Sequence, residues 1–197
     1  MYINQPIKNY LKLLAGRQAV PGGGSAAALV AAAGTALYVM VAAYSEPTRK
    51  IQQAKRKLKK IQAAMEGIVD RDAVVFTKLQ EAMKMPREVK QRTRLVQLGL
   101  RNAALAPLKL AGLCVAAMEA GAFLAEKGNK NLITDTGAAA LFLESAFAGA
   151  ALNVRINLKY LKQPGFVRSR IGQLQKLQRR MDTLKQRVTR SVEQKVR

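Results

Sequence analysis

Two aspartates stand in surroundings that suggest chemistry: Asp72 in the segment DRDAVVF and Asp135 in the segment NLITDTG. The chain has only 12 acidic residues, so a carboxylate among apolar side chains is notable here. Such a carboxylate can act as a general acid or base, or can stabilise a cationic substrate. Structural explanations exist for both: Asp72 on a solvated helix face or in an ion pair, and Asp135 as a helix N-cap. The local pattern alone favours these structural explanations.

The segment PGGGS precedes a long alanine-rich stretch and comprises Pro21, Gly22, Gly23, Gly24 and Ser25. Glycines at the start of a helix leave backbone N–H groups free at the positive end of the helix dipole, where an anion or a carbonyl oxygen can bind. They also let a ligand approach the backbone closely. The structural alternative is a tight turn with Ser25 as N-cap. No Lys-Ser/Thr pair follows the glycines, so the segment is not a Walker loop.

Several kinds of site are excluded by composition. The chain has no histidine, which rules out a Ser-His-Asp or Cys-His nucleophile and a His-ligated metal. Its one cysteine, Cys114, lies in the apolar segment LAGLCVAAM and is expected to be a buried thiol. From these residue types alone we expect no metal site built on His or Cys.

The spacing of apolar residues predicts an all-α chain, a single domain over 1–197 with about six helices. The helix expected over 25–44 is apolar on almost every side, which favours a central position in a bundle. Ser45 and Pro47 read as a helix start, and Pro107 as a kink. The six helices are expected over about 3–15, 25–44, 47–85, 87–127, 136–161 and 167–195.

The net charge of +22, from 34 basic and 12 acidic residues, favours an anionic partner. The last helix, about 167–195, is heavily basic around an apolar stripe, and nucleic acid, an anionic membrane surface or another polyanion would suit it. Residues 26–43 are uncharged, but alanine dominates them and charges interrupt the other apolar helices, so no membrane span is expected. The first residues lack a signal-peptide pattern, which favours a cytoplasmic protein.

Three blocks together resemble the cyclodeaminase/cyclohydrolase family: VPGGGSAAALVAAAGTALYVMV, DRDAVVF and KGNKNLITDTGAAALFLESAFAGAALNVRINLKYL. The resemblance implies an all-helical fold that forms a homodimer and binds a tetrahydrofolate near the glycine loop. The implied reaction is hydrolysis of 5,10-methenyltetrahydrofolate to 10-formyltetrahydrofolate, or deamination of 5-formiminotetrahydrofolate. A non-catalytic basic helical protein that binds nucleic acid or another polyanion remains the alternative.

The resemblance also implies roles for particular residues. Asp72 and Asp135 would be the acid/base groups, and Pro21 to Ser25 would line the pocket. Four polar residues would meet the pterin or position the loop: Asn129, Thr134, Asn153 and Asn157.

Overall fold

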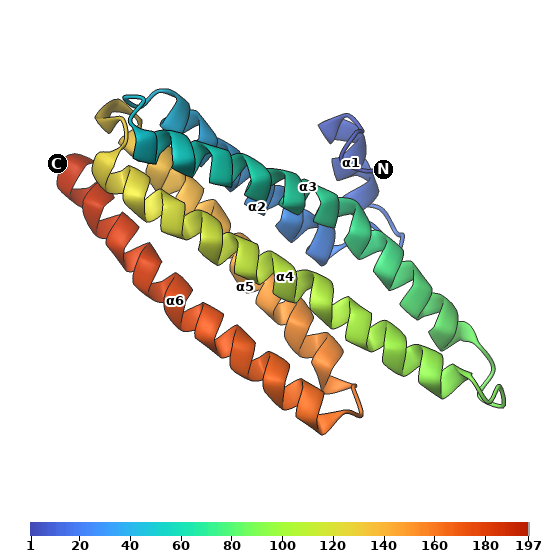
Figure 1. Ribbon diagram of the computed structural model, residues 1–197. Coiled ribbons are helices and arrows are strands. Elements are labelled where there is room, and N and C mark those ends of the chain that lie inside the picture. Colours follow the sequence, from blue (N-terminus) through green and yellow to red (C-terminus); the bar gives the residue numbers. More distant parts are fainter. Residues whose placement is uncertain (197) are drawn as a thin grey trace.

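The computed structural model describes residues 1–196, which form six α-helices, one short 3-10 turn and no strand (Figure 1). The expectation of an all-α domain of six helices is confirmed. The elements are α1 (Ile7–Leu14), α2 (Gly23–Ala43), α3 (Arg49–Lys84), α4 (Arg92–Lys127), η1 (Lys130–Leu132), α5 (Ile133–Lys159) and α6 (Pro164–Val196).

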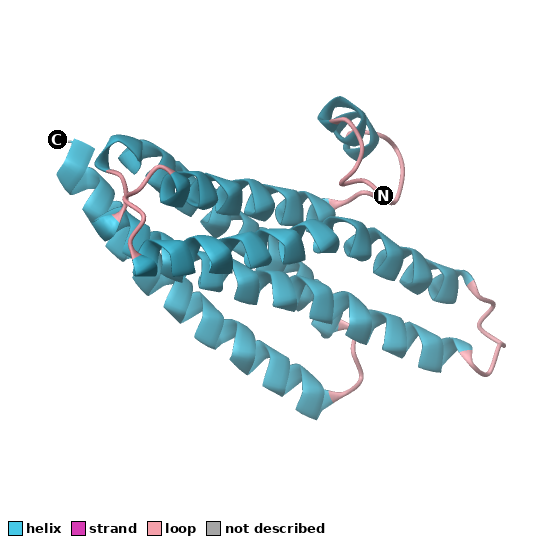
Figure 2. Ribbon diagram, turned by 45° about the horizontal axis from the view of Figure 1, so that its top comes forward, coloured by secondary structure: helices cyan, strands magenta, loops and turns pink. Residues whose placement is uncertain are grey.

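The five long helices form two layers that run along one axis. Helices α3, α4 and α6 make one layer with α4 in the middle, and α2 and α5 pack against it to make the other (Figure 1). The short helix α1 stands away from the bundle, beside the start of α2 (Figure 2). The N-terminus of α2 and the middle of α3 therefore meet close to the segment that carries α1.

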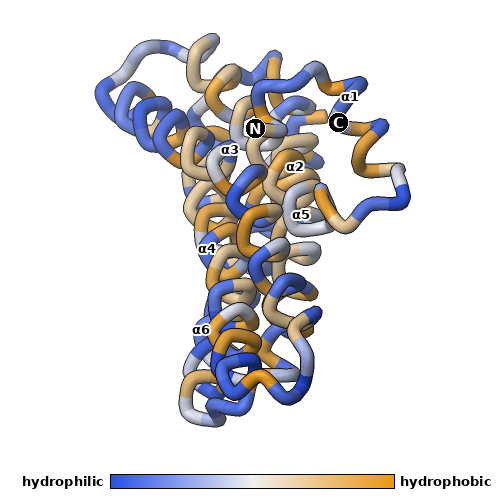
Figure 3. The backbone as a smooth tube through the Cα atoms, turned by 90° about the vertical axis from the view of Figure 1, so that its right-hand side faces the viewer, coloured by the Kyte–Doolittle hydropathy of each residue, from blue (hydrophilic) through white to orange (hydrophobic). Residues whose placement is uncertain are grey.

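The central helix is α4, and the expectation that α2 holds this place is wrong. Helix α4 packs against α3, α5 and α6, whereas α2 packs chiefly against α3 and α5. Helix α2 leaves Val30 and Ala33 exposed on its outer side. It has no charged residue, so its surface is uncharged both inside and outside the bundle, and Figure 3 colours its turns mostly in the hydrophobic range.

Small residues let these helices approach closely. The fully buried Tyr38 ring of α2 lies against Gly121 of α4, where even a methyl group would overlap the ring. The Tyr38 hydroxyl donates a hydrogen bond to the sulfur of Met118, 3.6 Å away. A glycine is therefore required at position 121 to accommodate the largest fully buried side chain.

Helix α3 begins at Arg49, later than the Ser45 N-cap predicted from the sequence would place it. Its N-cap is Thr48, whose hydroxyl accepts a hydrogen bond from the Ile51 N–H at 3.3 Å. Ser45 is instead buried: its hydroxyl donates to the Val41 carbonyl at 2.7 Å and accepts from the Asn129 N–H at 2.8 Å. Because Pro47 disfavours a helical conformation at Glu46, the helix cannot start at Glu46 as a Ser45 N-cap would require.

Other helix starts also differ from expectation. Helix α2 begins at Gly23 with Gly22 as N-cap, so Ser25 lies inside the first turn and does not cap it. Helix α4 begins at Arg92 and runs without interruption through Pro107. Helix α5 begins at Ile133, which places Asp135 inside its first turn and contradicts the N-cap explanation.

By length and composition alone, three helical stretches could cross a membrane: Gly23–Ala43, Arg92–Lys127 and Lys130–Lys159. In the bundle these stretches pack against one another, and the basic helices α3 and α6 pack against α4. The absence of a membrane span stays a prediction from the charges at Lys109, Glu119, Glu144 and Arg155.

Candidate active site

The glycine segment forms the first turn of α2. Gly22 is extended and caps the helix without a side-chain hydrogen bond, and its carbonyl accepts from the Ala26 N–H at 3.0 Å. Gly24 and Ser25 are buried, Gly23 is exposed, and Pro21 is buried behind the loop. The first N–H groups of α2 are thus free to meet a hydrogen-bond acceptor from outside the helix.

That acceptor is the Asp72 carboxylate of α3. The backbone N–H of Ser25 donates to it, and a methyl group on Gly24 would overlap it. Burial raises the pKa of the Asp72 carboxyl above its usual range, and the Ser25 hydrogen bond opposes this shift. Both structural explanations of Asp72 are wrong, because it is half-buried and no Lys or Arg pairs with it in the described chain. A carboxylate with a raised pKa can exchange a proton closer to neutral pH than an exposed one.

Tyr10 brings a second hydroxyl to this place. It is the buried residue of α1, and its phenol oxygen lies 3.1 Å from the Ser25 hydroxyl oxygen. Burial raises the pKa of the Tyr10 phenol, the Ser25 hydrogen bond lowers it, and the negative charge of Asp72 raises it further. Sequence reasoning missed Tyr10 because an aromatic residue in a short apolar helix is usually a packing residue. Its place in the helix that precedes the glycine loop was the available signal.

Helix α5 contributes Asn153 and Asn157, which are one turn apart and face the same side. The Asn153 amide nitrogen donates to the Gly149 carbonyl at 2.9 Å. The Asn157 amide nitrogen donates to the carbonyls of Ala103, at 3.2 Å, and Asn153, at 2.8 Å. Because the nitrogens bind backbone, the side-chain oxygens are the atoms free to accept a hydrogen bond from a ligand.

Gly22 to Gly24, Asp72, Asn153 and Asn157 line one cavity of about 420 Å³ between α2, α3, α4 and α5, whereas Pro21, Ser25 and Tyr10 lie behind its wall. This volume lies in the range of about 300–1,000 Å³ that small-molecule sites occupy. Its polar groups are the glycine backbone, Asp72, Gln80 and the two asparagines. Its walls also include the side chains of Phe76, Leu79, Met83, Ile156 and Tyr160. The cavity can hold a flat ligand against the helix start with a carboxylate beside it.

The remaining predicted residues lie at the other end of the bundle. Asn129 binds the Tyr44 carbonyl at 2.7 Å and accepts from the Asn131 N–H at 2.9 Å, so it joins the end of α2 to η1. Thr134 is exposed and Asp135 half-buried at the start of α5. Since α2 has 21 residues, its two ends are about 30 Å apart. Within one chain, Asn129, Thr134 and Asp135 do not reach the Asp72 cavity.

The structure shows the surroundings of the Cys114 thiol and of the side chains that could bind a metal ion. Cys114 is fully buried, which raises the pKa of its thiol to about 12 and makes it unsuitable as a nucleophile at neutral pH. Among residues 1–196, no three His, Cys, Asp or Glu side chains gather as a metal ligand set would.

Comparison with known proteins gives three kinds of similarity. The family model for formiminotransferase-cyclodeaminase matches residues 6–190. Methenyltetrahydrofolate cyclohydrolase of Methylorubrum extorquens is 30% identical over 204 aligned residues, which cover 98% of this chain and 98% of that protein. Formimidoyltransferase-cyclodeaminase of Mus musculus is 34% identical over 80% of this chain, but the chain spans only 31% of that longer protein. The crystal structure of formiminotetrahydrofolate cyclodeaminase from Thermotoga maritima superposes with a TM-score of 0.91 at 25% identity, covering 98% of both chains.

Proposed function

The chain belongs to the formiminotransferase-cyclodeaminase family, and from this membership we propose that it is a one-carbon folate enzyme whose active site is the Asp72 cavity. Its reaction is the hydrolysis of 5,10-methenyltetrahydrofolate to 10-formyltetrahydrofolate. The observation that carries the assignment is that Asp72, the glycine turn and two asparagines, which are far apart in sequence, meet in one cavity. Support for hydrolysis comes from the similarity to the cyclohydrolase over the full length of both proteins.

The chemistry requires a negative charge beside a cation. The methenyl bridge is an amidinium-like cation, and the half-buried Asp72 carboxylate stabilises it more strongly than an exposed one would. Water adds to the bridge carbon while Asp72 accepts its proton. The hydroxyl of the resulting adduct then loses its proton to form the carbonyl as the bond from that carbon to N5 breaks. N5 takes up a proton, and the formyl group stays on N10. The asparagine oxygens accept hydrogen bonds from the pterin and orient the ring.

Deamination of 5-formiminotetrahydrofolate is the second candidate reaction. It is favoured by the Thermotoga maritima cyclodeaminase, whose structure matches this one over 98% of both chains. Here N10 attacks the formimino carbon and loses its proton, while the formimino nitrogen gains two protons and leaves as ammonia. The same carboxylate then stabilises the same cationic bridge as the product. In both reactions the folate is the substrate, and we propose that no tightly bound cofactor is needed.

We propose that the enzyme is a homodimer formed through the outer face of α2 and α5. This face carries exposed apolar side chains, among them Val30, Leu141, Phe142, Leu152 and Ile156. Helix α2 has no charged residue, so a second copy would bury this face at low cost. In a two-fold dimer with antiparallel helices, the Asp135 end of one copy lies beside the Asp72 cavity of the other. Asp135 can join the reaction only in such an arrangement.

The dimer is tested by light scattering after chromatography. Leu152→Glu should convert the dimer to a monomer, because a charge would be buried at the interface. Leu98→Glu, on the opposite layer, is the matched control, since both leucines are at least half exposed. A monomeric parent protein would contradict the dimer.

The enzymatic proposal is tested by following the absorbance of 5,10-methenyltetrahydrofolate. The parent protein should accelerate its decay, and Asp72→Asn should abolish most of that acceleration at an unchanged circular dichroism spectrum. If the parent does not act on the methenyl substrate but releases ammonia from the formimino substrate, deamination is the reaction. Full activity of Asp72→Asn would overturn the assignment of the site.

A further inference from the structure

The basic residues are distributed unequally between the two layers. Helix α3 carries ten basic and four acidic residues, α4 five and two, and α6 nine and two. By contrast, α2 carries no charged residue and α5 carries two of each sign. Most of the net charge of +22 therefore lies on the α3–α4–α6 layer, away from the proposed dimer face.

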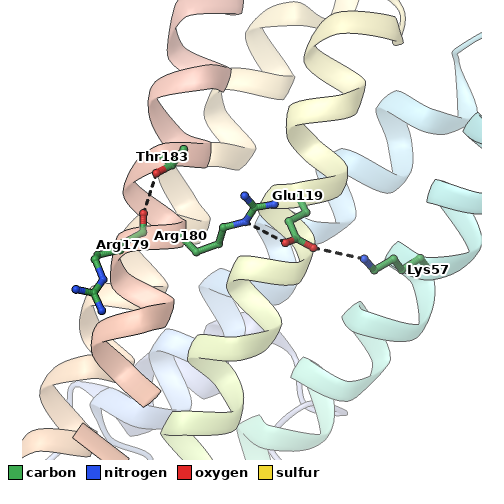
Figure 4. Close-up of polar contacts among 5 residues, drawn as sticks. All are labelled: Lys57, Glu119, Arg179, Arg180 and Thr183. Carbon is green, nitrogen blue, oxygen red and sulfur yellow. Dashed lines mark hydrogen bonds and ion pairs between the residues drawn. The ribbon is translucent and has the colours of Figure 1, made fainter. Parts of the chain in front are cut away.

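Two basic stretches that are far apart in sequence lie on either side of α4 at one end of this layer. Residues 49–60 of α3 hold seven basic and no acidic residues, and residues 176–195 of α6 hold seven basic and two acidic ones. Glu119 of α4 joins them: its carboxylate lies 3.8 Å from the Lys57 Nζ and 3.2 Å from the Arg180 Nε (Figure 4). Arg187 pairs with Glu126 about two helical turns further along, at 2.6 Å. We call the two stretches, with the α4 segment between them, the basic face.

The cations of the basic face outnumber the carboxylates that can neutralise them. The single Glu119 carboxylate is shared between one cation of α3 and one cation of α6. Like charges closer than the screening length of about 8 Å at physiological salt repel one another. The negative charges of a bound polyanion would reduce this repulsion among the Lys and Arg side chains. The basic face is therefore suited to bind a polyanion.

The geometry suits a double helix. Lys50, Lys57 and Lys60 follow one side of α3, and Lys176, Arg180 and Arg187 follow one side of α6, at helical spacing. Each row is about 16 Å long, because a helix rises about 1.5 Å per residue. The rows are separated by α4, so their helix axes are about 16–20 Å apart. That spacing lets the two rows reach phosphates on both sides of a groove, since the major groove of B-DNA is about 12 Å wide.

The same residues argue against a membrane surface and against base stacking. In the stretches 49–60 and 176–195, no large hydrophobic side chain is exposed. A helix that lies on a membrane needs such side chains to enter the lipid boundary. Neither stretch contains an aromatic residue, so unpaired bases have no side chain to stack on. What remains is contact with phosphates.

We propose that the basic face binds double-helical nucleic acid through its phosphates and without sequence preference. This binding is independent of the folate reaction, because the Asp72 cavity is lined by none of the basic-face residues. One molecule can therefore bind a duplex and turn over its substrate at the same time.

The test is fluorescence anisotropy with a labelled 24-base-pair duplex of arbitrary sequence, as DNA and as RNA, over a series of salt concentrations. Binding should weaken steeply with salt, by about 0.9 in log affinity per log salt for each phosphate contacted. The triple variant Lys57→Gln/Lys60→Gln/Arg180→Gln should bind at least about tenfold more weakly and show a smaller slope.

The matched control is Lys8→Gln/Lys12→Gln/Lys162→Gln, which removes the same charge from exposed positions outside the face. It should bind within about threefold of the parent, since it removes only long-range attraction. Equal losses in the two triple variants would overturn the proposal, because net charge alone would then explain binding. Binding to vesicles containing anionic lipid, with no duplex binding, would also overturn it. Asp72→Asn should bind the duplex as the parent does, so failure of the folate assignment is measured separately.

Discussion

At the scale of single residues, the site depends on how the Asp72 carboxylate is held. It lies against a glycine that leaves room for it, and one backbone N–H of the α2 turn binds it. Partial burial favours the protonated form, and the hydrogen bond favours the ionised form. The outcome is a pKa above the ordinary carboxylate value, and this has consequences for both activity and stability.

The pH dependence of the rate should show this shift. If Asp72 must be ionised to accept the proton of water, activity falls as the pH drops through its pKa. The acidic limb of the pH–rate profile should therefore lie above pH ~3.9, the value for an unperturbed aspartate. Asp72→Asn should lower the rate by about 10²- to 10⁴-fold and remove that limb. A limb that persists in the variant would assign it to another group.

Stability should change in the opposite direction. A carboxyl whose pKa is higher in the folded than in the unfolded chain binds its proton more tightly when folded. Its contribution to stability is full below the unfolded pKa and is lost as the pH rises through the folded pKa. At pH 7 the ionised Asp72 is thus destabilising, and Asp72→Asn should raise the Tm there, with a gain that shrinks toward pH 4. A lower Tm at pH 7 would contradict burial as the cause of the raised Asp72 pKa.

Gly24→Ala should displace the carboxylate, because the added methyl group overlaps it. A displacement of about 1 Å can cost about 10²-fold in rate, and overpacking costs about 1–3 kcal/mol of stability. Gly67→Ala on α3 is the control, since a methyl group there meets no other atom within 4 Å. It should leave activity unchanged and stabilise the helix by about 0.5–1 kcal/mol. Equal effects of the two variants would refute the close approach.

At the scale of elements, α1 holds the glycine turn in place although it stands apart from the bundle. Tyr10 binds Ser25, its ring meets the Tyr2 ring edge-on at 6.1 Å, and the Tyr2 N–H donates to Asp70 of α3. Helix α1 is thus linked both to the turn that binds the carboxylate and to the helix that carries it.

Tyr10→Phe tests this link. The variant leaves the buried Ser25 hydroxyl without its partner, which should cost about 1–3 kcal/mol and speed hydrogen exchange at the start of α2. Tyr44→Phe is the control, since Tyr44 is 70% exposed, and should change neither property. Unchanged exchange in Tyr10→Phe would show that α1 does not support the turn.

How much the sequence predicts differs between elements. The spacing of Asn153 and Asn157 places them on one helical face, and the resemblance brings them to the glycine turn, as the structure shows. The same block contains Asp135, but eighteen residues of helix α5 carry it about 27 Å from Asn153. The sequence block alone does not show that Asp135 and Asn153 lie so far apart in space. The position of α2 was mispredicted because a helix that is apolar on all sides fits the centre of a monomer and a subunit interface equally well.

At the scale of the whole molecule, the proposed dimer makes a prediction that mutants of one chain alone cannot give. If Asp135 of the partner serves the Asp72 cavity, Asp72→Asn and Asp135→Asn should each be inactive, whereas their mixed dimer holds one intact site. Equal mixing with free exchange should restore about one quarter of the parent activity, since about half of the dimers are mixed. If both variants are inactive and mixing restores no activity, the two groups act within one chain. If Asp135→Asn is fully active, Asp135 takes no part in the reaction.

The contact between Gly24 and Asp72 also ties the two positions together over the course of evolution. While the carboxylate stays, any side chain at position 24 collides with it, so substitutions there are selected against. Once a lineage replaces Asp72 by a smaller residue, the constraint on position 24 is released. Among related sequences, a residue other than glycine at position 24 should therefore occur together with loss of the aspartate, and should identify members that have given up folate chemistry while keeping the bundle.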